Sequence, residues 1–244
     1  MEEFKSFVFT HIPKCGGTSF RQYINNTAIE SGINVNKIYI PGFNGVDNDQ
    51  NIPQLKKDEL NLVNERDFTI IADHSKYREN ELLGIRLENP FYFTILRDPV
   101  KRLISHYNFF YFTHGYQNCK NVKLDDLPDE KLDHLLAHLG NIQVIYLSNI
   151  KHKKIVGLEN MMKIAKYNIQ YEFDSVGIIE KMDRSLEVLL EKAPNWLKFN
   201  TKFPKLNKSK SSKIKLSKKT LDKIEHYNQY DIKLYNFAKS FLNI

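Results

Sequence analysis

Residues 7–21 read Phe-Val-Phe-Thr-His-Ile-Pro-Lys-Cys-Gly-Gly-Thr-Ser-Phe-Arg and predict a strand, a tight turn and the start of a helix. Aromatic and β-branched residues fill the run up to Phe9, as is typical of a strand buried on both faces of a sheet. Pro13 ends this run. Gly16 and Gly17 lack a Cβ, so the backbone there can turn tightly and approach a ligand closely.

The start of the predicted helix offers a site for an anion. Thr18 and Ser19 are suited to cap this helix, whose first N–H groups and dipole attract negative charge. Lys14 adds a cation, but it precedes both glycines, whereas the nucleotide triphosphate loop G-x-x-x-x-G-K-[ST] has its lysine after the last glycine. The stretch therefore predicts a different anion loop, and the alternative is an ordinary strand-turn-helix with exposed polar residues.

Two more apolar runs, residues 68–72 and 91–96, predict strands, and each ends at a residue able to do chemistry. His74 follows the first run and Arg97 follows the second. Functional residues of open α/β sheets gather just past the carboxyl ends of strands, so both are well placed. A lone histidine is more often structural than catalytic, so both a catalytic and a structural role stay open for His74.

A helix is predicted directly after Arg97. Asp98 suits its N-cap and Pro99 its first position, where a missing N–H costs little. Ser105 lies two turns further along. An arginine fork and a hydroxyl can converge on one phosphate, and the alternative is that Arg97 pairs with a nearby carboxylate such as Asp98.

The rest of the chain predicts further elements of an α/β fold. The expected helices are one from the first loop to about residue 32, then residues 54–65, 131–139, 158–167, 182–192 and 216–242, and the expected strands are 37–40 and 173–180. The aromatic run 107–116 is expected to extend a helix and to break near Gly115, and it suits either an acceptor cleft or the core. Residues 198–219 form a lysine-rich loop.

The length of the chain favours a single domain, and its charge favours an anionic partner. A chain of 244 residues with 41% hydrophobic residues suits a single α/β domain over residues 1–244. The formal charge of +7 favours a nucleotide, an acidic glycan, nucleic acid or a membrane surface, and we find no nucleic-acid recognition motif. Cys15 and Cys119 are the only cysteines, so no disulfide framework or cysteine metal site is expected.

Two motifs resemble those of sulfotransferases that use 3′-phosphoadenosine 5′-phosphosulfate (PAPS). The order His-Ile-Pro-Lys-Cys-Gly-Gly-Thr-Ser over residues 11–19 resembles the 5′-phosphosulfate loop of the carbohydrate branch, which includes the heparan sulfate 2-O and 6-O enzymes and bacterial relatives. Residues 97–107, with the pattern R-D-P-x-x-R-L-x-S-x-Y, resemble the family's 3′-phosphate motif. The resemblance implies a central, mainly parallel sheet flanked by helices, of the nucleotide-kinase-like type.

The resemblance also implies roles for particular residues. The implied PAPS-binding residues are Lys14, Cys15, Gly16, Gly17, Thr18, Ser19, Arg97, Ser105, Lys208, Ser209 and Lys210. Cys15 departs from the family's threonine or serine, so one hydroxyl contact is missing. The implied catalytic residues are Lys14 and His74, with His74 as the base that takes the acceptor's proton; His11 and His106 stay open as alternatives. No metal is implied.

The implied acceptor is a carbohydrate hydroxyl, on a glycan or an anionic polysaccharide, and the implied acceptor contacts are His11, Asn141 and Gln143. Two other classes stay open: a nucleotide-dependent kinase on the same sheet, and a non-catalytic protein that binds glycans or nucleic acid through charge. With no signal peptide or span of about 18 apolar residues in the sequence, we expect a cytoplasmic location, or the Golgi lumen if the chain is a shortened form.

Overall fold

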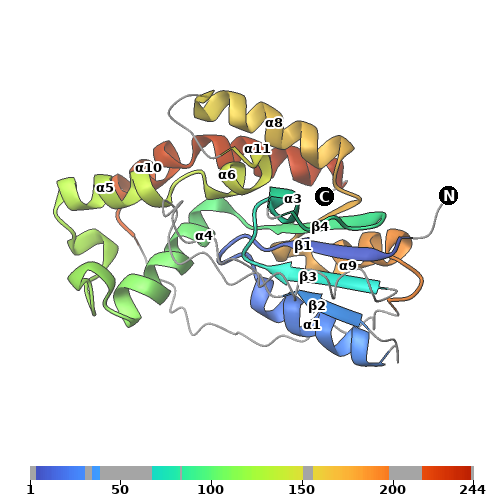
Figure 1. Cartoon of the computed structure of the whole chain (residues 1–244). Coiled ribbons are helices and arrows are strands. Elements are labelled where there is room, and N and C mark those ends of the chain that lie inside the picture. The colour runs from blue at the N-terminus through green and yellow to red at the C-terminus, as the bar shows by residue number, and fades with distance from the viewer. Residues whose placement is uncertain are drawn as a thin grey trace.

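In the part of the chain that the structure describes, five parallel strands form a sheet in the order β2-β3-β1-β4-β5 (Figure 1). The structure is a computed structural model that describes residues 4–30, 35–38, 68–82, 84–150, 156–197 and 216–242. The strands are β1 (Ser6–Thr10), β2 (Val35–Ile38), β3 (Phe68–Asp73), β4 (Pro90–Leu96) and β5 (Ser175–Ile178). The expected α/β class with a mainly parallel sheet is confirmed.

Alternate side chains of the central strands enter two different cores, because successive residues of a strand point to opposite faces. In β1, Val8 packs on one face, while Phe7 and Phe9 pack on the other. The first face is covered by α6 (Ile142–Ser148), α8 (Leu158–Tyr171) and α11 (Gln229–Phe241), and the second by α1 (Gly17–Glu30) and α9 (Met182–Lys192).

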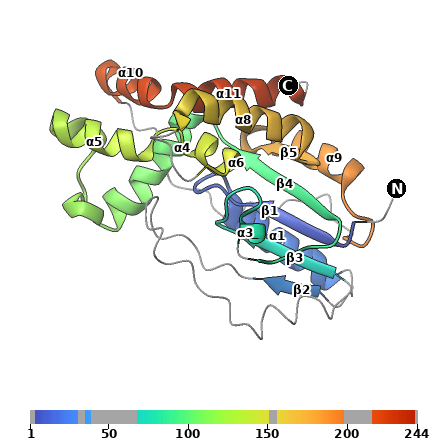
Figure 2. The same cartoon turned by 45° about the horizontal axis from the view of Figure 1, so that its top comes forward.

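A third apolar cluster lies beside the sheet rather than on it. Helix α4 (Pro99–His106) leads directly into a π-helical segment, η1 (Tyr107–Thr113), and both pack against α5 (Asp129–Leu139) and α10 (Lys218–Tyr227). These helices extend to one side of the sheet in both views (Figure 2). The shorter elements are α3 (Glu79–Leu82), η2 (Tyr116–Asn118), η3 (Leu124–Asp126) and η4 (Ile179–Lys181).

The prediction of a single C-terminal helix is wrong, because residues 216–242 form two helices, α10 and α11. They meet at Asn228, which leaves helical geometry with φ −110° and ψ 14°. Its fully buried side chain donates to the Ile224 carbonyl at 2.8 Å and accepts from the Asn141 N–H at 3.4 Å. Both helices bury one apolar face, so their hydrophobic periodicity continues across the break. The sequence pattern therefore does not reveal where one helix ends and the next begins.

The predicted caps of α1 are also wrong. The Phe20 N–H donates to the Gly16 carbonyl at 3.1 Å, so the helix begins at Gly17 and places Thr18 and Ser19 inside its first turn. Strand β2 lies two residues earlier than expected, and β5 is shorter because η4 follows it at once. The expected helix 54–65 and most of the lysine-rich loop, residues 198–215, lie outside the described residues.

Candidate active site

The ends of three neighbouring strands bring the predicted site residues to one edge of the sheet. Thr10, the last residue of β1, pairs with Asp73, the last residue of β3, so His11 and His74 follow side by side. Strand β4 lies on the other side of β1 and ends one residue before Arg97. The parallel sheet therefore gathers residues that are far apart in the sequence.

The loop after β1 is held in an unusual backbone conformation. Lys14 and Gly16 both have positive φ angles, of 68° and 82°. The Lys14 carbonyl accepts a hydrogen bond from Arg97 Nη1 at 2.9 Å. A Cβ on Gly16 would lie 2.2 Å from Ile179 Cδ1, so only glycine fits there without a shift of Ile179. Alternation of positive and negative φ in a loop turns N–H groups toward one concavity, which suits an anion.

The cations of the loop and of the β4 end lie close together. Burial first, and then the Arg97 charge, lower the pKa of Lys14. The Lys14 ammonium lies 4.0 Å from the centre of the Phe109 ring, on η1. Such a concentration of positive charge, partly shielded from water, can stabilise negative charge that develops on a bound group.

The aromatic run that follows α4 is divided between the core and the surface. Tyr107 and Tyr111 are buried in the third cluster, with their rings stacked 5.4 Å apart. Phe109 and Phe110 are exposed, at 45% and 39% of their surface. The core role is thus confirmed for Tyr107 and Tyr111, and a role of the exposed rings in an acceptor cleft stays a prediction.

The two histidines at the strand ends form a stacked pair. The ring centres of His11 and His74 are 3.7 Å apart with 23° between the planes, and His74 Nδ1 lies 3.2 Å from the His11 carbonyl oxygen. Burial lowers the pKa of His74 and holds that of His11 well below its usual value. His106, in the last turn of α4, is also buried, and burial is the main cause that lowers its pKa to about 3.

The backbone around Arg97 is fixed by two side chains. Gln143 Oε1 accepts from the Arg97 N–H at 2.9 Å, and Gln143 Nε2 donates to the Arg97 carbonyl at 2.9 Å. Glu180 accepts from the Asp98 N–H at 3.2 Å. The Asp98 side chain accepts from the Lys101 N–H at 2.9 Å, which confirms it as the N-cap of α4. These bonds hold the Arg97 backbone in place. Ser105 lies half-buried on α4.

Asn141 and Gln143 are buried where the start of α6 packs against α11. Asn141 Oδ1 accepts from the Tyr230 and Asp231 N–H groups, each at 3.0 Å. The Asp231 carboxylate accepts from the N–H groups of Gln143 at 3.1 Å and of Val144 at 2.8 Å. Sequence reasoning missed Asp231, because a single acidic residue in a helix carries no pattern that separates it from surface charge.

Six further residues were expected to contact the donor, and the structure describes three of them. The Cys15 thiol is fully buried and lies 3.7 Å from Gln143 Oε1, so it faces the interior, and burial raises its pKa to about 12. Thr18 is exposed and Ser19 is buried in the first turn of α1. The expected contacts Lys208, Ser209 and Lys210 lie outside the described residues.

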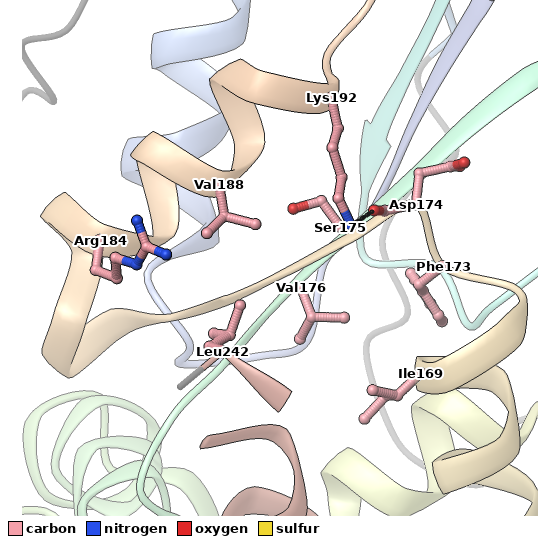
Figure 3. Close-up of a pocket in the computed structure, with 9 residues that line it drawn as sticks. All are labelled: Ile169, Phe173, Asp174, Ser175, Val176, Arg184, Val188, Lys192 and Leu242. Carbon is pink, nitrogen blue, oxygen red and sulfur yellow. Dashed lines mark hydrogen bonds between the residues drawn. The ribbon is translucent and has the colours of Figure 1, made fainter. Parts of the chain in front are cut away.

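A pocket of about 80 Å³ lies away from these residues, beside the edge strand β5 (Figure 3). Its walls come from β5 and from α8, α9 and α11, and its lining residues include Ile169, Ser175, Arg184 and Lys192. None of the predicted site residues lines it. The described residues hold no group of three or more His, Cys, Asp or Glu side chains arranged to bind a metal ion.

A glycine-bearing loop after the first strand, with cations and a histidine from neighbouring strand ends, is the arrangement expected of an α/β enzyme that binds a phosphorylated or sulfated group. The model of the Sulfotransferase family matches residues 1–238, and the chain belongs to this family. The predicted class is confirmed.

Individual relatives agree with the family. The chain is 24% identical over 254 residues to heparan sulfate 2-O-sulfotransferase 1 of Cricetulus griseus and 23% identical over 254 residues to that of Homo sapiens, covering 97% of this chain and 70% of each relative. It is 24% identical over 283 residues to heparan-sulfate 6-O-sulfotransferase 1-B of Danio rerio, covering 95% of this chain and 64% of the relative. The expected resemblance to the 2-O and 6-O branch is confirmed.

The expected cytoplasmic location is wrong. The relatives are heparan sulfate sulfotransferases, which are Golgi enzymes. In the described ranges, no helix has the length and apolar character needed to cross a membrane.

Proposed function

We propose that this chain, acting as one domain over residues 1–244, transfers a sulfuryl group from PAPS to a hydroxyl of a carbohydrate. The observation that carries the proposal is the hydrogen bond from Arg97 Nη1 to the Lys14 carbonyl at 2.9 Å. It joins the two motifs that resemble the 5′ and 3′ phosphate sites, which are 83 residues apart in the chain. Family membership and the relatives named above support the reaction class and a polysaccharide acceptor.

Lys14 and the N–H groups at the start of α1 act on the 5′ end of the donor in this proposal. Sulfuryl transfer leaves negative charge on the oxygen that bridges sulfur and phosphorus, much as phosphoryl transfer does on its leaving oxygen. The Lys14 ammonium and the helix N-terminus stabilise that charge as it develops. Gly16 and Gly17 let the backbone come close enough to do so.

His74 is the proposed base. The acceptor hydroxyl gives its proton to His74 Nε2, its oxygen bonds to sulfur, and the bond from sulfur to the bridging oxygen breaks, which releases adenosine 3′,5′-bisphosphate. A base must be unprotonated before the reaction, and burial, which lowers the pKa of His74, favours that form at neutral pH.

Arg97 and Ser105 are the proposed partners of the donor's 3′-phosphate, with Lys208, Ser209 and Lys210 as further contacts. An arginine fork matches phosphate geometry and fixes the register of the nucleotide. Gln143 brackets the Arg97 backbone, and we therefore assign it the role of holding Arg97 in place. Asn141 supports this arrangement by binding the first turn of α11, which packs against Gln143.

Calorimetric binding of adenosine 3′,5′-bisphosphate, with AMP and ATP as controls, tests the proposal. We expect binding that needs the 3′-phosphate and persists in EDTA, followed by transfer of ³⁵S from labelled PAPS to O-desulfated heparin. A preference for ATP with magnesium would move the protein to the kinase class. Binding of heparin alone, with steep salt dependence and no nucleotide binding, would indicate a polyanion-binding protein.

A further inference from the structure

We propose that His11 is a positioning residue, whose ring and backbone carbonyl hold His74 in one orientation and one tautomer. The inference rests on the proposed function, because it concerns the base of that reaction. His11 makes two contacts with the His74 ring, one from its side chain and one from its main chain.

The rings form a column that runs from the core to the site. The Phe9 and His11 ring centres are 5.5 Å apart with 18° between their planes, and the His11 and His74 centres are 3.7 Å apart with 23° between theirs. Phe9 and His11 are almost completely buried, at 1% and 2% exposure. Stacking on a buried ring restricts the plane of His74 far more than a contact with a mobile side chain would.

Gly17 makes room for this column. A Cβ at Gly17 would lie 1.8 Å from Cδ2 and 1.9 Å from Nε2 of His11. The second glycine of the loop therefore has a purpose besides close approach to an anion, since any larger residue would displace the His11 ring from its place against His74. The anion loop and the base are thus linked through one side chain.

The His11 carbonyl selects the tautomer of His74. A carbonyl oxygen only accepts hydrogen bonds, so His74 Nδ1, 3.2 Å away, must carry the hydrogen. In the neutral ring this leaves the lone pair on Nε2, the nitrogen that the proposed function uses as base. A partner on one ring nitrogen commonly sets the chemistry of the other in this way.

The charge of His11 matters because its ring touches the base. The charged and titratable groups around the pair are Arg21 on α1, Lys14 on the loop and His106 on α4. Burial, and then the nearby His74, hold the pKa of His11 well below its usual value, so His11 stays neutral at pH 7. A cationic ring 3.7 Å away would oppose protonation of His74, whereas a neutral ring does not.

Burial also separates the roles of the two histidines. His11 Nδ1 is buried and has no hydrogen-bond partner in the described part of the chain, so it does not reach an acceptor at the surface of the loop. His74 is more exposed than His11. His11 is therefore better suited to support the base than to replace it.

The first measurement uses the unmodified chain labelled with ¹⁵N-histidine. Two-bond ¹⁵N–¹H spectra report the tautomer and pKa of each histidine, and a His74→Gln spectrum assigns the His74 signals. We expect the Nδ1–H tautomer for His74 in the protein alone. Finding the Nε2–H tautomer would overturn the inference.

The variants His11→Phe and His11→Leu separate the ring from its nitrogen atoms. We expect His11→Leu, which removes the stacked ring but keeps the backbone carbonyl, to loosen the orientation of the His74 ring and so to change its spectrum. The variant should also shift the acidic limb of the kcat profile and lower kcat by about tenfold or more, with donor affinity little changed. His11→Phe keeps a flat ring and should preserve the tautomer and restore kcat to within about fivefold of wild type. A His11→Leu protein with an unchanged His74 spectrum would overturn the inference.

Equal inactivity of His11→Phe and His74→Gln would also overturn it, because the His11 nitrogens would then be essential. Failure of the proposed function has a different signature. Wild-type protein would then transfer no sulfuryl group from PAPS to O-desulfated heparin, while the spectra would still decide whether His11 orients His74.

Discussion

The Lys14 ammonium of the loop after β1 lies 4.0 Å from the centre of the Phe109 ring on η1. This contact joins the anion loop to a π-helical segment, in which each turn holds an extra residue and which is frequent at functional sites. Phe109 is 45% exposed, so its ring covers the ammonium from the solvent side without being part of the core. We infer that η1 helps to place the Lys14 ammonium, which the proposed reaction uses.

Replacement of Phe109 should weaken the placement of Lys14. A cation–π contact stabilises a charged lysine by roughly 0.5–2 kcal/mol, so we expect Phe109→Leu to lower turnover by up to about tenfold and Phe109→Tyr to stay near wild type. Tyr116→Leu, on η2, is the matched control, since its exposed ring packs on Tyr111. Steady-state kinetics measure the effect, and equal losses in the Leu and Tyr variants would contradict a role for the ring's π face.

Lys14 and Arg97 should affect different steps. We expect Lys14→Ala to lower kcat by about 100-fold or more while the Kd for adenosine 3′,5′-bisphosphate changes little, because Lys14 acts on charge that develops during the reaction. Arg97→Ala should mainly raise that Kd, since it removes a contact present before and during the reaction. Calorimetry and kinetics on the same preparations separate the two effects. Unchanged turnover in Lys14→Ala would rule out its assigned role.

Gln143→Leu should act through the Arg97 backbone. It leaves the Arg97 N–H and carbonyl without their partners, and a buried polar group without a hydrogen bond costs about 1–3 kcal/mol. We expect a lower midpoint in denaturant unfolding and a raised Kd for adenosine 3′,5′-bisphosphate. Gln170→Leu, on the exposed side of α8, is the control. A large loss of stability with normal affinity would show that Arg97 keeps its place without Gln143.

Gly17→Ala should disturb both the anion loop and the histidine pair. Its Cβ would lie 1.8 Å from the His11 ring, a distance that requires the ring to move. Gly84→Ala is a useful comparison, because Gly84 has φ of 78° but open space around it, so only backbone strain of about 1–2 kcal/mol is expected. We predict loss of turnover in Gly17→Ala and near-normal kcat in Gly84→Ala. Similar kcat values in the two variants would mean that the His11 ring yields without consequence.

Acid should destabilise the fold through its buried histidines. Burial lowers the pKa of His106 to about 3, so the unfolded chain takes up a proton first as pH falls. The neutral histidine contributes its full share to the free energy of unfolding above about pH 6.5. This share is lost as the pH falls toward the pKa of the folded state, at up to about 1.4 kcal/mol per pH unit for each such histidine. Urea unfolding from pH 7 to 5 should show this loss. His106→Phe should flatten the dependence, and exposed His226→Phe is the control; equal slopes in both would contradict the prediction.

Local patterns were sufficient to place most elements and the residues after the strand ends. The aromatic and β-branched runs around β1, β3 and β4 are buried on both faces, and such runs differ clearly from amphipathic helices. Asp98 and Pro99 marked the start of α4 because capping depends on neighbouring residues alone. The gathering of His74 and Arg97 near Lys14 followed from a general property of parallel sheets.

The supporting contacts depend on which distant segments meet. Nothing local distinguishes Gln143 or Asp231 from ordinary polar residues, and their roles appear only when α6 packs between β4 and α11. The break at Asn228 is equally hidden, since its partner Asn141 lies 87 residues away.

By itself, the sequence determined the fold class, the anion loop and the family, because strand composition, glycine spacing and caps are short-range features. Only the tertiary structure decided that His11 stacks on His74, that Phe109 covers Lys14 and that the Cys15 thiol faces the interior. These relationships join residues from different elements, so they depend on sheet order and helix packing rather than on any local preference of the chain.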